Sequence, residues 1–220
     1  MTKNFVRATY CAVLLVIVAG LTTLPASAAP IYVQPTDFNG AFASQNDTTG
    51  GFGNFATAFD NFTLGGSYSL NSVQWVGSYF NPSTLAPITG FTVSIYADSG
   101  GAPGALLWTS GDVAGNAGET FIGFDLGNNP TYAYSMGVSF AAAGGTTYWL
   151  SIVPDLGFPP QWGWETGVGG DGAAYQCFLG SCGAVSSDLA FALSTPEPSS
   201  MVFLATGLVA LGIRVRNRMS

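Results

Sequence analysis

Hydrophobic and polar residues alternate in short runs between residues 29 and 194. In one run, Val73, Trp75 and Tyr79 fall on one face of an extended chain, and Gln74 and Ser78 fall on the other. A period of two, carried by β-branched and aromatic residues, is typical of half-buried β-strands. Glycine pairs separate the runs, as turns do. The pattern therefore predicts strands and gives no sustained helical periodicity.

The run boundaries set the expected fold class. We predict strands at residues 56–64, 70–80, 90–97, 104–109, 119–126, 132–140, 146–153, 161–166 and 189–194. Strands of this length with turn-rich spacers indicate an all-β domain, an antiparallel β-sandwich with jelly-roll-like connectivity. Residues 34–55 are predicted to be a loosely ordered start of that domain.

The first 28 residues have the pattern of a signal peptide. Lys3 and Arg7 precede an apolar run, and Ala26 and Ala28 supply the small residues of a cleavage site. We predict cleavage after Ala28. The alternative is an uncleaved anchor, for which the apolar run is short, because a span needs about 20 apolar residues.

The last 26 residues, 195–220, form a third segment. An apolar run from Met201 to Ile213 predicts a transmembrane helix of marginal length, since a hydrocarbon core is roughly 30 Å thick. A basic cluster follows at Arg214, Arg216 and Arg218. By the positive-inside rule, this cluster is cytoplasmic and the β domain faces outward.

The three-part tail resembles the PEP-CTERM sorting signal. Its Pro196-Glu197-Pro198 motif, short apolar helix and terminal arginines correspond to that arrangement. The resemblance implies processing near the motif by an exosortase, an integral-membrane cysteine transpeptidase. It further implies a Gram-negative source that makes exopolysaccharide or biofilm. A plain tail anchor that is never cut is the alternative, but it does not require the Pro-Glu-Pro motif.

The distribution of charge excludes several classes of function. All five basic residues lie in the terminal segments, and residues 29–195 contain eleven acidic residues without any Lys, Arg or His. Nucleic-acid binding needs cations to neutralise phosphates. Ser-His-Asp and Cys-His catalytic centres need a histidine, as do the common zinc sites. We therefore expect no nucleic-acid partner and no catalysis of these kinds.

Two cysteines, Cys177 and Cys182, remain in the predicted domain. In an exported segment this spacing favours a local disulfide, which closes a small loop. The alternative, a metal site, would lack ligands because no histidine is present.

Two tryptophans are candidates for a glycan platform. Trp162 and Trp164 are two residues apart, so on a strand they point to the same face. If exposed, they would stack on sugar rings, and if buried, they fill the core, which the general tendency of tryptophan favours.

Carboxylates are the other candidates for chemistry. Calcium, the one cofactor left open, could use turn-region aspartates, although these side chains also serve as ordinary turn residues. These aspartates are Asp37, Asp47, Asp60, Asp98, Asp155 and Asp171. A glycoside hydrolase needs two carboxyl groups. The formal candidates are Glu119, Glu165, Asp155 and Asp171, none of which lies in a recognisable motif.

Together these patterns predict an exported, non-catalytic protein of the cell surface or extracellular matrix. Its expected partners are an exosortase-like enzyme, the membrane through the C-terminal helix before processing, and extracellular polysaccharide. A carbohydrate-binding module is the alternative function, followed by a carboxylate-based glycoside hydrolase.

Overall fold

Strands and turns make up residues 29–196, the part of the chain that the computed structural model describes. Within this range no helix is present, so none of the described secondary structure could cross a membrane as a helix. The predicted signal peptide and the predicted C-terminal helix lie outside the described residues.

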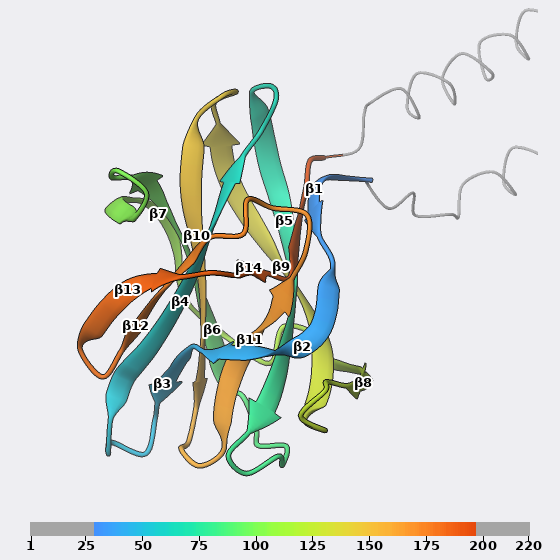
Figure 1. Ribbon diagram of the computed structural model, residues 1–220, viewed down its shortest axis with the longest axis vertical. Helices are drawn as coiled ribbons and strands as arrows, with labels where there is room; N and C mark the ends of the chain where they lie inside the picture. Colours follow the sequence, from blue (N-terminus) through green and yellow to red (C-terminus); the bar gives the residue numbers. More distant parts are fainter. Residues whose placement is uncertain (1–28, 197–220) are drawn as a thin grey trace, which may run out of the picture. The chain divides into compact units, whose positions relative to one another are not determined.

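Eight strands form the first sheet, called sheet A (Figure 1). They are β1 (Pro30–Gln34), β2 (Thr36–Ala43), β5 (Tyr68–Phe80), β8 (Thr120–Phe124), β9 (Pro130–Ala142), β11 (Gln161–Gly167), β14 (Asp188–Leu189) and β15 (Phe191–Ser194). The long strand β5 lies at its centre. One edge of β5 pairs with β9, and the other pairs first with β15 and then with β11.

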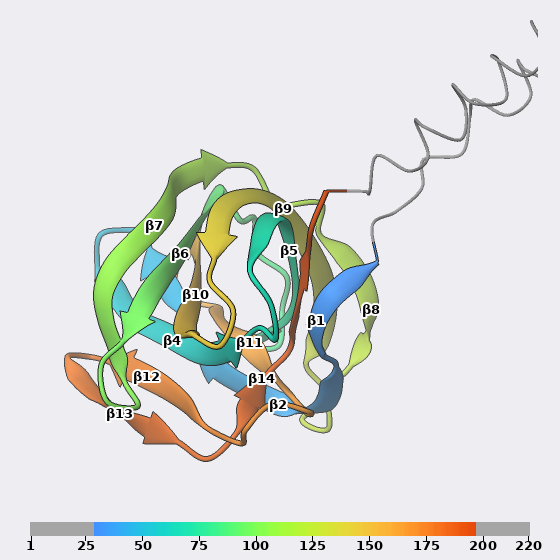
Figure 2. The same ribbon diagram turned by 90° about the horizontal axis from the view of Figure 1, so that it is seen from above.

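Seven strands form the second sheet, called sheet B. They are β3 (Gln45–Asp47), β4 (Gly53–Thr63), β6 (Gly90–Asp98), β7 (Pro103–Ala114), β10 (Thr147–Leu156), β12 (Ala174–Phe178) and β13 (Ser181–Val185). All pairings in it are antiparallel except β3 with β10. The two sheets form opposite layers (Figure 2), which confirms the all-β fold and the sandwich. The jelly-roll-like connectivity remains a prediction.

Aromatic side chains fill the space between the sheets. The rings of Trp75 and Tyr134, from neighbouring strands of sheet A, are stacked with centroids 5.6 Å apart. Phe91 of sheet B meets Trp75 and Trp162 edge-on at 5.0 and 5.9 Å. A β-carbon at Gly77 would overlap the Trp162 ring, so glycine makes room for the indole. Burying each such ring stabilises the fold by about 1.5–3 kcal/mol. Large aromatic residues therefore occupy the inward positions of these strands, and this produces the alternation in the sequence.

The predicted loose start at residues 34–55 is wrong for most of its length. Strands β2 and β3 occupy Thr36–Asp47, where β2 pairs with β11 and β3 with β4 and β10. Buried polar side chains, Ser44 and Gln45, replace the hydrophobic alternation there. Both side chains hydrogen-bond to residues more than a hundred positions away; the Ser44 hydroxyl, for example, donates to the carbonyl of Ile152 at 2.5 Å. Such partners exist only after folding, so local patterning could not reveal these strands.

A second element that the sequence pattern did not predict is the hairpin of β12 and β13. Its strands pair in register at Cys177 and Cys182, and a disulfide joins these two residues. The Leu179 N–H at its tip donates to the carbonyl of Phe55 at 2.7 Å, which fixes the tip of the hairpin to the start of β4. Strand β13 is largely exposed and most of β12 is half-buried, and neither strand has the alternation of buried and exposed hydrophobic residues that marks a half-buried strand.

Candidate functional site

The chain enters and leaves the described β domain at neighbouring positions. Strands β1 and β15 pair antiparallel, and Pro30 lies opposite Ser194. The chain then passes through Thr195 to the exposed Pro196. The first and last strands of the unit are therefore neighbours, and the predicted signal-peptide cleavage and sorting segments adjoin this one strand pair in sequence.

Most of the predicted sorting residues lie outside the described residues. These are Ala26 and Ala28 at the signal cleavage site, Glu197 and Pro198 of the motif, the Met201 to Ile213 run, and Arg214, Arg216 and Arg218. Their predicted roles remain predictions.

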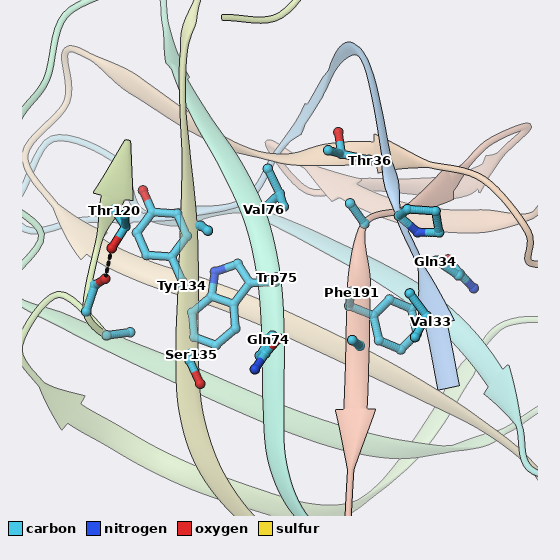
Figure 3. Close-up of a pocket in the computed structure, with 16 residues that line it drawn as sticks. Val33, Gln34, Thr36, Gln74, Trp75, Val76, Thr120, Tyr134, Ser135 and Phe191 are labelled. Carbon is cyan, nitrogen blue, oxygen red and sulfur yellow. Dashed lines mark hydrogen bonds between the residues drawn. The ribbon is translucent and has the colours of Figure 1, made fainter. Parts of the chain in front are cut away.

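A groove of about 540 Å³ lies on sheet A, across β9, β5, β15 and β1 (Figure 3). One wall is the segment that leads into β8, which contributes Ala117, Gly118 and Thr120, and the other is Val33–Thr36, where β1 ends and β2 begins. Its lining residues are Val33, Gln34, Pro35, Thr36, Gln74, Trp75, Val76, Ala117, Gly118, Thr120, Ala133, Tyr134, Ser135, Ala190, Phe191 and Ala192. The volume is within the range of ligand pockets, roughly 300–1,000 Å³.

Small outward-facing residues create the groove. On β9, Tyr134 points into the core while Ala133 and Ser135 alternate with it, and on β15, Ala192 alternates with the buried Phe191. Along these strands large rings alternate with short side chains. The rings therefore lie in the core, and the short side chains lie on the outer surface of the sheet. The floor is low because these side chains are short, and the two flanking segments rise beside it.

The groove carries uncharged polar groups. Gln74 and Ser135 are register partners on β5 and β9, and they lie next to each other in Figure 3. Both are exposed, and neither side chain makes a hydrogen bond within residues 29–196. Thr120, in contrast, donates to the carbonyl of Gly118 at 2.9 Å. None of the lining residues is charged.

Trp162 and Trp164, the candidate glycan platform, are both fully buried, which is the alternative that the general tendency of tryptophan favoured. The two indoles do point to one face, as the spacing predicted, but that face is the core. The Trp162 Nε1–H donates to the Tyr134 hydroxyl at 3.1 Å, and the Trp164 Nε1–H donates to the Ala190 carbonyl at 2.8 Å. Neither ring is available to a ligand.

Glu119, the first hydrolase candidate, is held by tyrosines. It accepts hydrogen bonds from Tyr79 at 2.5 Å and Tyr134 at 2.9 Å. Burial, followed by the interaction with Glu119, raises the pKa of Tyr79, and burial raises that of Tyr134. Both hydroxyls are therefore neutral donors, and they orient the carboxylate.

Glu165, the second candidate, is fully buried on the outward side of β11. Its two carboxyl oxygens and the neighbouring Ser78 hydroxyl have no hydrogen-bond partner within the described range. Burial raises the pKa of Glu165 to about 7, with smaller contributions from Asp125 and Asp37. No access path connects this carboxyl to a substrate, because neither Glu165 nor Ser78 has exposed surface.

The remaining two hydrolase candidates lie on sheet B and in a loop. Asp155 is within hydrogen-bonding distance of Asp112, and burial together with Asp155 raises the pKa of Asp112. Two carboxyls in direct contact are closer than the roughly 5 Å or more between the catalytic carboxyls of glycosidases. Asp171 accepts from the Asn61 amide at 3.1 Å and from the Ala173 N–H.

The other aspartates considered as calcium ligands fasten turns and loops. Asp47 accepts the Thr49 hydroxyl and the backbone N–H groups of Gly51, Phe52 and Phe158, and these bonds lower its pKa. Asp98 accepts the Trp149 Nε1–H at 2.8 Å. Such contacts are those of turn residues.

Asp37 and Asp60 show opposite pKa shifts. Partial burial opposes the hydrogen bonds to Asp37, but those from Thr166 and Asn39 prevail and lower its pKa. Burial raises the pKa of Asp60 to about 8, although the Leu189 and Asn61 N–H groups donate to it. With its amide nitrogen turned toward Asp60, Gln34 donates at 2.7 Å. Within residues 29–196, no group of three or more acidic or cysteine side chains is placed to hold a metal ion.

Sequence reasoning did not find the groove residues. The signal that could have found them is the small outward residue between inward aromatic residues, as in Tyr132-Ala133-Tyr134-Ser135. Recognising it requires knowing that β9, β5 and β15 are neighbours, which only the sheet topology supplies.

Comparison with known proteins addresses the tail. No curated protein matches the chain. Residues 194–217 match the family described as the PEP-CTERM protein-sorting motif, and this match begins at Ser194, the last residue of β15. The predicted resemblance is confirmed: the chain carries a PEP-CTERM protein-sorting motif directly behind its described β domain.

Proposed function

We propose that this chain is an exported, non-catalytic protein of the cell surface or extracellular matrix. A signal peptide cut after Ala28 delivers it, and the tail at residues 195–220 sorts it. The observation that carries the proposal is the PEP-CTERM motif at residues 194–217, which supports export and sorting by an exosortase system. The motif starts where the last strand ends, so the sorting segment follows the β domain without a long linker.

The carboxylates of the domain support a role without catalysis. Tyrosines hold Glu119, Glu165 is enclosed, Asp155 contacts another carboxyl, and Asp171 binds an amide. Hydrolysis of a glycoside requires two carboxyl groups on either side of an accessible substrate. The contacts of Glu119, Asp155 and Asp171 are those of structural carboxylates, and Glu165 is buried away from solvent.

The three parts of the tail define the proposed route of the protein from the membrane to the cell surface or matrix. Before processing, the Met201 to Ile213 helix would hold the protein in the membrane of a Gram-negative bacterium. Arg214, Arg216 and Arg218 would lie on the cytoplasmic side. An exosortase-like enzyme would then cut near Pro196 to Pro198, and the domain would pass to the surface or the polymer matrix.

Intact mass spectrometry of protein recovered from the native cell surface and from the medium tests this route. We expect a mass that runs from Ala29 to the region of Pro198, with or without an added group at the new C-terminus. A mass that still contains residues 201–220 would mean a plain tail anchor, and the proposed processing would be wrong.

A matched pair of variants separates sorting from anchoring. Changing Glu197→Ala and Pro198→Ala leaves the apolar run and the arginines intact, whereas deletion of residues 195–220 removes all three parts. We expect unprocessed, membrane-held protein from the first variant and release into the medium from the second. Normal processing of the first variant would contradict a role for the motif.

A further inference from the structure

The groove on sheet A is uncharged in a strongly acidic domain. Eleven carboxylates occur between residues 29 and 195, yet none belongs to the groove lining. An anionic ligand would meet the field of the surrounding carboxylates without any cation to bind it. A cationic ligand would find no charge in the lining to pair with, because the adjacent Glu119 is outside the lining and accepts hydrogen bonds from Tyr79 and Tyr134. The lining therefore fits an uncharged ligand.

The floor of the groove offers side chains and no free backbone. It consists of the surface of β9, β5 and β15, whose backbone groups pair with one another along Ser72–Ser78 and Phe191–Ser194. An extended peptide binds to a sheet chiefly through the unpaired backbone groups of an edge strand. Because that row of groups is used up here, recognition must rely on side-chain polar groups and on apolar contact.

Side-chain polar groups and an apolar surface lie side by side in the groove. Gln74 presents an amide with two N–H donors and a carbonyl acceptor, and Ser135 beside it presents a hydroxyl. Val76, Ala133 and Ala192 provide a low apolar surface next to this pair. A sugar ring combines these same properties, since it has C–H faces and hydroxyl groups that both donate and accept. A purely apolar ligand would leave Gln74 and Ser135 covered without partners, at a cost in affinity.

The groove also has the length for a chain. It spans β9, β5, β15 and β1, and neighbouring strands lie about 4.8 Å apart, so it extends roughly 14 Å across the sheet. We propose that this groove binds a segment of an uncharged polysaccharide, with Gln74 and Ser135 hydrogen-bonding to its hydroxyl groups. Binding involves the β domain alone, so it does not depend on whether the tail is processed.

The test uses the full chain and its variants, made in the native host and recovered from the surface or medium. Affinity electrophoresis in gels that contain dextran, galactomannan or β-glucan measures binding to neutral polymers. Gels that contain alginate measure binding to an anionic polymer, and a glycan array widens the neutral set. We expect retardation by at least one neutral polymer and none by alginate. Because no charges pair, retardation should be unchanged between about 0.05 and 0.5 M NaCl.

Variants locate the binding. Gln74→Ala with Ser135→Ala should weaken binding about tenfold or more through the lost hydrogen bonds. Ala192→Phe should abolish binding because the ring fills the floor. The matched control is Asn71→Ala with Ser139→Ala, which removes exposed polar groups from the same two strands outside the groove. Thermal unfolding of each variant shows that the fold is kept.

Three outcomes would overturn the proposal. The first is no binding of the wild type to any neutral polymer or glycan on the array. The second is equal weakening by the control pair, which would place binding elsewhere. The third is a protein or peptide ligand whose binding Ala192→Phe blocks while glycan binding is absent. Failure of tail processing, read by mass, leaves each of these readouts unchanged.

Discussion

The outer face of sheet A has an open half and a covered half. In the open half, Val76, Ala133 and Ala192 line the groove, and none of the residues in its lining is charged. In the covered half, Ser78, Thr131 and Glu165 face outward but have no exposed surface. There the Leu126 N–H donates to the Phe38 carbonyl at 2.8 Å, which joins the loop after β8 to strand β2.

This difference shows how a domain without cations can bury a carboxyl. Glu165 has no basic partner within the described residues, and burial raises its pKa more than the neighbouring Ser78 hydroxyl lowers it, so a proton is the means of neutralising it. Its pKa of about 7 follows from that enclosure. The open half has no buried carboxyl to neutralise, because its outward side chains are small or uncharged. The same sheet thus supports a pH-sensitive region and a region that does not titrate.

The largest expected effect on stability concerns the core side chains that lie beneath both halves of the outer face of sheet A. Trp164→Ala should lower the free energy of unfolding by about 3–5 kcal/mol, because it leaves a cavity and frees the Ala190 carbonyl. Trp164→Phe keeps most of the volume and loses the hydrogen bond, so it should cost less. Urea unfolding of both measures this. A near-neutral Trp164→Ala would contradict the buried position and reopen the predicted platform.

The next effect is the pH dependence of stability in the covered half. The pKa of Glu165 is about 7 in the folded protein and 4.5 in the unfolded chain, so between these values the folded state binds more protons. The free energy of unfolding should therefore fall as pH rises from about 4.5 to 7, by up to about 3 kcal/mol. Above pH 7 this contribution stays constant.

Glu165→Gln isolates that contribution, because the amide does not titrate and has almost the same shape. Denaturant unfolding of both proteins from pH 4.5 to 8 should give a difference that grows with pH. Asp60, with a pKa of about 8, also makes the free energy of unfolding depend on pH. This dependence is the same in both proteins, so it cancels in the difference between them. A constant difference across this range would mean that Glu165 is not enclosed.

A smaller effect should follow from loosening the cover. Asp125 accepts the backbone N–H and the side-chain amide of Asn129, and it also raises the pKa of Glu165. Asp125→Ala should cost about 1–2 kcal/mol from the lost hydrogen bonds. It should also move the titration of Glu165 toward 4.5. If stability falls while the pH dependence stays as in the wild type, the loop does not determine the enclosure.

The smallest effect is expected in the open half. Gln74→Ala and Ser135→Ala should each change the free energy of unfolding by less than about 0.5 kcal/mol, because both side chains are exposed and lack protein partners. Thermal unfolding measures this. A loss above 1 kcal/mol would show that these groups serve the fold, which would weaken the case for a binding groove.

Sequence alone determined the features that depend on local or compositional information. The alternation of Val73, Trp75 and Tyr79 gave the core face of β5, because a strand repeats every two residues. The absence of Lys, Arg and His from residues 29–195 could be read without any fold, and it predicts that several classes of chemistry are absent. The tail motif is linear, so Pro196-Glu197-Pro198 and the segments behind it could be recognised directly.

The tertiary structure decided everything that depends on which strands are neighbours. It placed Trp162 and Trp164 inside, where Trp162 meets Phe91 and Tyr134 and Trp164 meets Phe191, all from other strands. It ordered residues 36–47 through partners more than a hundred positions away. It enclosed Glu165 and left the groove beside Gln74 open. Periodicity gives the two faces of a strand, but what covers each face depends on long-range packing, which a local pattern does not contain.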